Sequence, residues 1–431
     1  MPSVPQMRQL SRSNAMLRAV APTMELSKLQ EEVRILRAEL IRKDAIIKGL
    51  LSTLEVTSIT TEGKVKSSTP LQDLCQISKE ACDAVTPMLR AFYDQISDQR
   101  LGGSSKLKSD ATYFTIADGI VQHLFIKYLF AGDKFAQIVG EEDESVINII
   151  NKPYSVDDLE VPDEFNAIIA ATLQEIQQLS NRIDPNLYKS MTVFVDPIDG
   201  TREFATGQGQ YVTILIGYND ALGHPAAGIM YRPLTTPVTW AAGAASEEVV
   251  MGELDMADPP VPNGMLITDG KVSPFIVDLI DELGYQRIGS VASGNRAMML
   301  LEGKGGAYIR DTGGFAKWDT SAPTAVIEAY GGTMSKLPPF LDDGSLIGYT
   351  HLKSGKNLDF MPGQSTLTLS NIKDKSAFVK GSEIKSSDVE SVKAYACLQG
   401  LVAVDKAAMK DLPKIREAML AVMKENKPTY T

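Results

Sequence analysis

The sequence has few of the residues that disulfide frameworks and structural zinc sites require. Its 431 residues include three cysteines, Cys75, Cys82 and Cys397, and three histidines. An odd, low cysteine count predicts a reducing compartment and no disulfide framework. The histidines show no ligand spacing, which argues against a structural zinc site. Any chemistry in this chain is therefore expected to rest on carboxylates.

Long apolar runs and an excess of positive charge are also missing. No apolar run of about 18 residues occurs, so no membrane-spanning segment is expected. The formal net charge of -11 argues against binding a nucleic acid polymer, which needs a basic surface. It leaves room for a small anionic substrate, because a bound metal can reverse the local sign. The length allows two or three domains, each with a core of its own.

The first residues differ in composition from the rest. Residues 1–23 carry three arginines, several serines and no acidic residue, a composition that resembles an organellar transit peptide. A disordered leader is the alternative. The localisation therefore stays open between the cytoplasm and an organelle, either plastid or mitochondrion.

A heptad pattern follows this leader. Apolar residues recur at three- and four-residue steps from Leu26 to Leu54, with Lys43 as one polar exception. This pattern predicts a coiled-coil helix over residues 24–56 that joins two copies of the chain or an assembly partner. A helix that folds back on its own domain is the alternative.

The remaining chain divides into an α+β half, residues 66–235, an α/β half, residues 236–383, and a helical tail, residues 384–431. The second half alternates strand and helix, which favours an α/β layer distinct from the first half. Helices are expected at 71–96, 115–129, 162–180, 274–284, 295–302 and 322–330, and strands at 135–139, 192–195, 211–218, 225–231, 264–268, 286–289 and 307–310.

The segment Met191–Thr201, with the sequence MTVFVDPIDGT, carries the densest chemical signal. A β-branched, apolar run predicts a buried strand that Pro197 and Gly200 end in a tight turn. Asp196 and Asp199 can then converge on one point, which is costly unless a cation lies between them. An acidic turn after a core strand, without function, is the alternative.

Two further acidic motifs complete a pattern. Gly140-Glu141-Glu142 closes a predicted strand, and Asp319 lies in the later segment KWDTSAP. In this order, the three motifs resemble the lithium-sensitive, magnesium-dependent phosphomonoesterases related to inositol monophosphatase, over residues 70–383. The motifs GTREF, SGNR and EGK resemble 3'(2'),5'-bisphosphate nucleotidases, with inositol polyphosphate 1-phosphatases as the nearest neighbours. The resemblance implies a layered αβαβα sandwich.

The resemblance also implies a role for each acidic residue. Glu141, Asp196, Asp199, Asp319 and the carbonyl of Ile198 would bind two or three Mg²⁺ ions, for which oxygen ligands are suited. Thr201 would orient the attacking water, with Glu141 or Glu142 nearby.

Further matched positions would hold the substrate, a small phosphorylated anion. The N–H groups of Gly200 and Thr201 would bind phosphate oxygens. Ser293 and Arg296 match positions that contact a second phosphate or a sugar, and Arg296 replaces the more usual lysine. Lys271 falls near a position where nucleotidases often carry histidine.

One departure from the family pattern concerns the general base. The pattern Asp-x-x-Thr-x-Ala-Asp corresponds to residues 112–118, where Thr112 replaces the first aspartate and Asp110 lies two residues earlier. A threonine cannot accept a proton at neutral pH, so the rate would fall roughly 10²–10⁴-fold without compensation. Either Asp110 substitutes for it, or the enzyme is slow, or the chain binds substrate with little turnover.

The sequence therefore predicts a Mg²⁺-dependent phosphomonoesterase. The expected substrate is 3'-phosphoadenosine 5'-phosphate, and inositol 1,4-bisphosphate is the alternative within the same class. A degenerate phosphatase fold that serves as a scaffold through its coiled coil is the alternative from another class.

Overall fold

The computed structural model describes residues 68–101, 116–141, 146–157, 159–268, 272–311, 315–359 and 392–428. They belong to the second of two compact units, residues 68–431. None of their helices is long and apolar enough to cross a membrane. The leader, the predicted coiled coil and three predicted site residues, Asp110, Glu142 and Lys271, lie outside the described residues. Thr112, which replaces the expected aspartate, lies outside them as well.

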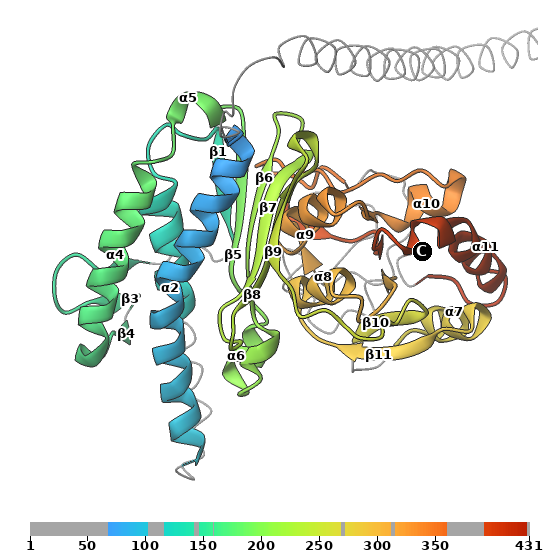
Figure 1. Cartoon of the computed structure of the whole chain (residues 1–431), viewed down its shortest axis with the longest axis horizontal. Helices are drawn as coiled ribbons and strands as arrows, with labels where there is room; N and C mark the ends of the chain where they lie inside the picture. Colours follow the sequence, from blue (N-terminus) through green and yellow to red (C-terminus); the bar gives the residue numbers. More distant parts are fainter. Residues whose placement is uncertain are drawn as a thin grey trace, which may run out of the picture. The chain divides into compact units, whose positions relative to one another are not determined.

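A six-stranded sheet forms the centre of the first half (Figure 1). Its strand order is β1-β5-β6-β7-β8-β9, in which β1 and β5 are parallel and the other neighbours are antiparallel. The bounds are β1 (Gln137–Gly140), β5 (Thr192–Asp199), β6 (Thr213–Asn219), β7 (Pro225–Arg232), β8 (Thr239–Ala244) and β9 (Val249–Glu253).

Helices cover the outer face of this sheet. The long helices are α2 (Pro70–Leu101) and α4 (Asn166–Ser180), and residues 116–123 are helical before the π-helix η1 (Leu124–Leu129). Cys75 and Cys82 lie buried on α2 as free thiols. The shorter elements are β2 (Ile147–Asn148), β3 (Ser155–Val156), β4 (Leu159–Glu160), η2 (Asp163–Phe165), α5 (Pro185–Tyr188), α6 (Thr201–Ala205), η3 (Gly209–Tyr211) and η4 (Ala245–Glu247).

A second sheet of five strands, in the order β11-β10-β12-β16-β14, forms the centre of the second half. Strand β10 is parallel to β11 and β12, and β16 is antiparallel to both of its neighbours. The five strands are β10 (Gly264–Thr268), β11 (Gln286–Ser290), β12 (Ala307–Arg310), β14 (Thr333–Ser335) and β16 (Leu401–Val404). Strands β13 (Phe315–Ala316) and β15 (Ala396–Cys397) pair with each other in a separate two-stranded sheet. The helices are α7 (Pro274–Leu283), α8 (Ser293–Leu301), α9 (Trp318–Ala329), α10 (Leu337–Asp343), η8 (Ala408–Asp411) and α11 (Leu412–Val422).

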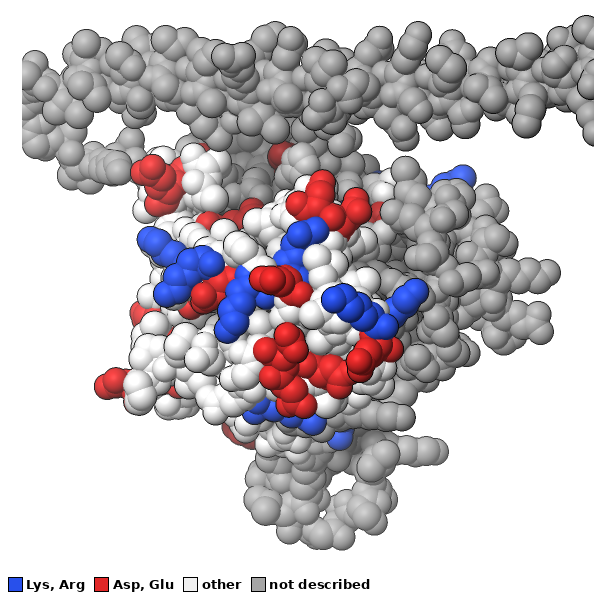
Figure 2. Space-filling model, turned by 90° about the vertical axis from the view of Figure 1, so that its right-hand side faces the viewer, with Lys and Arg blue, Asp and Glu red and all other residues white. Residues whose placement is uncertain are grey.

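These elements stack in the predicted αβαβα order (Figure 1). Helices α2 and α4 cover the first sheet, α8 and α9 lie between the sheets, and α7 and α11 cover the second sheet. One cluster of buried apolar side chains lies between the first sheet and its outer helices, and another lies between the second sheet and α7 and α11. A third surrounds α8 and α9 and contacts both sheets. On the face that carries α7 and α11, acidic and basic side chains are interspersed (Figure 2).

A row of glycines allows α9 to approach the first sheet closely. Gly217, Gly228 and Gly243 are neighbours across β6, β7 and β8. A Cβ on Gly217 would lie 2.1 Å from the Ser321 Oγ, and one on Gly228 would lie 2.9 Å from the Ala322 Cα. Helix α9 can therefore pack this close to the sheet only because these three positions carry no side chain.

The C-terminal segment differs from the helical tail that the sequence predicts. Strand β16 lies in the second sheet between β12 and β14, and only residues after it form η8 and α11. All four residues of β16 are buried. A buried apolar strand carries no alternation that distinguishes it from a helix of the same length, which explains the error.

We expect Gly228→Ala to destabilise the fold by about 1–3 kcal/mol, because the new Cβ meets backbone atoms of Ala322 that cannot move aside. Chemical denaturation monitored by circular dichroism measures the change. Gly355→Ala is the matched control, since a Cβ there meets nothing within 4 Å. Equal stability of the two variants would contradict the close contact of α9 with the sheet.

Candidate metal and phosphate site

Asp196 and Asp199 come from the end of β5, which is buried along its whole length. Asp196 pairs with Leu215, and Asp199 pairs with Thr213, so two residues of β5 oppose the single residue Ile214. This bulge changes the alternation of the strand, and both carboxylates can therefore point to the same side. The turn continues through Gly200, whose φ of +96° favours glycine.

Asp319 reaches the same place from the first turn of α9. Its Oδ2 accepts a hydrogen bond from the Ala316 N–H at 2.6 Å, which fixes the side chain at the start of the helix. The preceding Lys317 is fully buried, and its Nζ lies 3.0 Å from the Asp359 Oδ2. This ion pair ties the start of α9 to the segment before residue 360.

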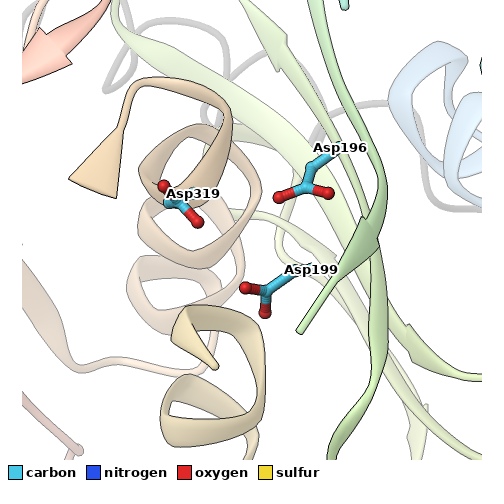
Figure 3. A group of neighbouring side chains, drawn as sticks. All are labelled: Asp196, Asp199 and Asp319. Atoms are coloured by element: carbon cyan, nitrogen blue, oxygen red, sulfur yellow. The ribbon is translucent and has the colours of Figure 1, made fainter. Parts of the chain in front are cut away.

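The three carboxylates face one another (Figure 3). One oxygen from each of Asp196, Asp199 and Asp319 lies within 4.8 Å of the others. Glu141 joins this group from the end of β1, because its N–H donates to the Val195 carbonyl at 3.1 Å, and its side chain hydrogen-bonds Asp196. Four carboxylates from β1, β5 and α9 thus converge.

Burial and mutual repulsion make this cluster hard to ionise. Burial, followed by the charges of Glu141, Asp199 and Asp319, holds the pKa of Asp196 well above its usual range. Burial, followed by the charges of Asp199 and Glu141, does the same to the pKa of Asp319. The Asp196 Oδ1 is buried without a hydrogen-bond partner. An unpartnered oxygen and an all-oxygen donor set fit a hard divalent cation.

Three hydrogen bonds hold the Asp199 carboxylate in place. It accepts hydrogen bonds from the Thr213 Oγ1 at 2.6 Å, the Ser293 N–H at 3.1 Å and the Gly294 N–H at 2.7 Å. Burial raises the pKa of Asp199, while these bonds and the Arg296 charge lower it. A Cβ on Gly294 would lie 2.3 Å from the Thr213 Oγ1, so only glycine lets this N–H approach.

The loop after Asp199 borders the cluster. Gly200 is the N-cap of α6, and Thr201, the first residue of that helix, is exposed. Neither residue has a hydrogen bond that would show a phosphate-binding role, so the roles of their N–H groups stay predictions. The same holds for the carbonyl of Ile198, whose side chain is buried in the bulge.

Two arginines lie on the second-sheet side of the cluster. Arg296, on α8, is 7% exposed and donates to the Ser290 Oγ, the Ser290 carbonyl and the Tyr308 Oη. Among the described residues, two of its five N–H groups have no partner, and the side chain forms no ion pair. Arg310 ends β12, and its charge lowers the pKa of Asp319.

The structure thus brings together most of the predicted residues that it describes. Glu141, Asp196, Asp199 and Asp319 form one cluster, and the backbone N–H of Ser293 donates to Asp199. Sequence reasoning missed four contributors, Thr213, Gly294, Tyr308 and Arg310. Arg310 could have been predicted, because it ends a predicted parallel strand, and ligands bind at the carboxyl ends of such strands.

The fold and the site define a layered α/β protein whose buried carboxylate cluster has the oxygen ligands that a metal ion would need. A family model, described as the inositol monophosphatase family, matches residues 71–348. The chain belongs to this family.

Several known proteins are similar to this chain. The mouse 3'(2'),5'-bisphosphate nucleotidase 1 is 31% identical over 160 residues, 35% of this chain and 51% of that protein. The Dictyostelium discoideum 3'(2'),5'-bisphosphate nucleotidase 1 is 29% identical over 276 residues, 59% of this chain and 84% of that protein. The chain thus spans about half the length of the mammalian relatives it matches. The solved structure of an inositol monophosphatase from Zymomonas mobilis covers 82% of this chain and 100% of its own, with 14% identity and a TM-score of 0.45.

We expect Asp196→Asn to change how stability depends on pH in the metal-free protein. A raised pKa means that the folded state binds the proton more tightly, so this stabilisation is present at low pH and is lost as the pH rises above the usual aspartate range. The free energy of unfolding of the variant should depend less on pH, and at pH 8 it should exceed that of the wild type by about 0.5–2 kcal/mol. Thermal unfolding in EDTA at pH 5 and pH 8 measures both effects. If the stability of both proteins depended on pH in the same way, Asp196 would not be repelled by the neighbouring carboxylates.

We expect Gly294→Ala to weaken metal binding about 10–100-fold, because the added methyl group displaces an N–H that orients Asp199. Isothermal titration with Mg²⁺ measures the affinity, and Gly355→Ala again serves as the control. Unchanged affinity would show that Asp199 keeps its orientation without the start of α8.

Proposed function

We propose that this chain is a Mg²⁺-dependent phosphomonoesterase that removes one phosphate from a small bisphosphorylated metabolite, with 3'-phosphoadenosine 5'-phosphate as substrate. The observation that carries this proposal is the carboxylate cluster beside two guanidinium groups. Membership of the inositol monophosphatase family and similarity to named 3'(2'),5'-bisphosphate nucleotidases support the reaction class.

Each acidic residue has a role in this proposal. Glu141, Asp196, Asp199 and Asp319, together with the Ile198 carbonyl, hold two or three Mg²⁺ ions. The bound ions supply positive charge that polarises the phosphate and favours the attacking water.

The chain's other groups position the reactants. Thr201, exposed next to the cluster, orients the water with its hydroxyl, and the N–H groups of Gly200 and Thr201 bind phosphate oxygens. Asp110 lies outside the described residues, and its proposed role is to accept the proton that Thr112 cannot take.

The second phosphate of the substrate occupies the arginine side of the site. Guanidinium groups match phosphate oxygens in geometry and stay charged at any physiological pH. Arg296 is buried with two unused N–H groups and no ion pair among the described residues, which is costly unless an anion completes its shell. A bisphosphorylated substrate meets this requirement, whereas a monophosphate leaves it unmet.

We expect phosphate release from 3'-phosphoadenosine 5'-phosphate with Mg²⁺ and none in EDTA. Asp319→Asn should lower kcat/KM at least about 100-fold, since it removes a carboxylate from the cluster where the metal supplies several kcal/mol. Asp281→Asn, at an exposed position of α7, is the control and should keep full activity. Colorimetric phosphate detection measures both.

The same assay separates the proposal from its alternatives. Faster release from inositol 1,4-bisphosphate would assign the chain to inositol polyphosphate hydrolysis. No release from either substrate would overturn the enzyme assignment and favour a scaffold with a retained phosphatase fold.

A further inference from the structure

Tyr308 occupies an unusual place between the two arginines. It lies on β12, two residues before Arg310 and thus on the same face of the sheet, and it is 2% exposed. The Arg296 Nη1 donates to its Oη at 3.3 Å, and Arg310 also hydrogen-bonds this oxygen. The Arg296 guanidinium also lies over the Tyr308 ring, 5.3 Å from its centroid. One phenol oxygen therefore joins two cations.

Other buried tyrosines of the structure behave differently. Burial holds the pKa values of Tyr218 and Tyr349 well above the usual tyrosine range. Burial acts on Tyr308 in the same direction, but the positive charges of Arg296 and Arg310 outweigh it and lower its pKa. The two guanidinium groups thus share the phenol oxygen of Tyr308 as a common hydrogen-bond acceptor.

Two guanidinium groups repel each other, and a common acceptor offsets this repulsion. Arg310 has a further support in the Phe315 ring, whose centroid lies 4.9 Å from its Cζ. Arg296 has the Ser290 oxygens on its other side. The charge of Arg296 acts on Asp199, and the charge of Arg310 acts on Asp319, so the pair of arginines borders the carboxylate cluster.

We infer that Tyr308 is a positioning residue, whose hydroxyl holds Arg296 and Arg310 together so that the pair binds the second phosphate of a bisphosphorylated substrate. Its hydroxyl thereby sets the preference for bisphosphates over monophosphates. The inference rests on the proposed function for the identity of the substrate class. An arginine pair held in place before the ligand arrives loses less conformational freedom on binding, which increases affinity.

The test is Tyr308→Phe, which removes one oxygen and keeps the ring. Titration calorimetry in EDTA, where no metal is bound, compares 3'-phosphoadenosine 5'-phosphate with adenosine 3'-monophosphate, and inositol 1,4-bisphosphate with inositol 1-phosphate. The variant should bind the preferred bisphosphate about tenfold more weakly, the effect of a lost hydrogen bond to a charged group. Its affinity for the monophosphate should stay within about twofold of that of the wild type.

Tyr218→Phe is the matched control, because Tyr218 is also fully buried and its hydroxyl lies 2.6 Å from the Ser78 Oγ in the first core. It should lower the melting temperature without changing either affinity. In the presence of Mg²⁺, Tyr308→Phe should raise KM for the bisphosphate about tenfold and leave kcat unchanged.

The binding and turnover results separate the two proposals. A selective loss of bisphosphate binding in a protein without turnover would support the role of Tyr308 and overturn only the proposed function. Equal losses for bisphosphate and monophosphate, no loss for either, or no binding of any ligand by the wild type would each overturn the positioning role.

Discussion

The close contact between α9 and the first sheet is the constraint on which the site depends. Asp319 belongs to α9, while Asp196 and Asp199 belong to β5, so their separation is set by the depth at which the helix lies. The glycine row of Gly217, Gly228 and Gly243 sets this depth, and the Ser321 Oγ donates to the Asn219 Oδ1 at 3.0 Å to fix the helix along the strand. Close-packed interiors transmit such shifts, so a displaced helix would separate the carboxylates.

The buried carboxylates repel one another and destabilise the fold, and hydrogen bonds from surrounding residues offset this destabilisation only in part. Thr213, Ser293 and Gly294 donate to Asp199, while Asp196 keeps a buried oxygen without a partner. A carboxylate that served stability alone would have such a partner. Of these two aspartates on one strand, Asp196 therefore has the oxygen that an ion from outside the chain would complete.

The order of the layers and the grouping of the main acidic residues followed from the resemblance of three acidic motifs to a known family. Local patterns alone separated only the mixed first half from the alternating second half. The sequence was not sufficient for β16, whose buried residues have no period that distinguishes strand from helix. It also could not reveal that Thr213 and Gly294 hold Asp199, since those contacts join positions 14 and 95 residues apart. Side-chain partners across such separations depend on strand register and helix depth, which local patterns do not encode.

Helix α8 links the two chemical parts of the site. Its first N–H groups hold Asp199, and Arg296, one turn later on the same side of the helix, contacts Tyr308. The Arg296 charge lowers the pKa of Asp199, so an anion that neutralised Arg296 would weaken this support. A cation bound by the carboxylates would restore it. In the proposed function, the binding of cation and anion would therefore be coupled, and each would favour the other by the same free energy.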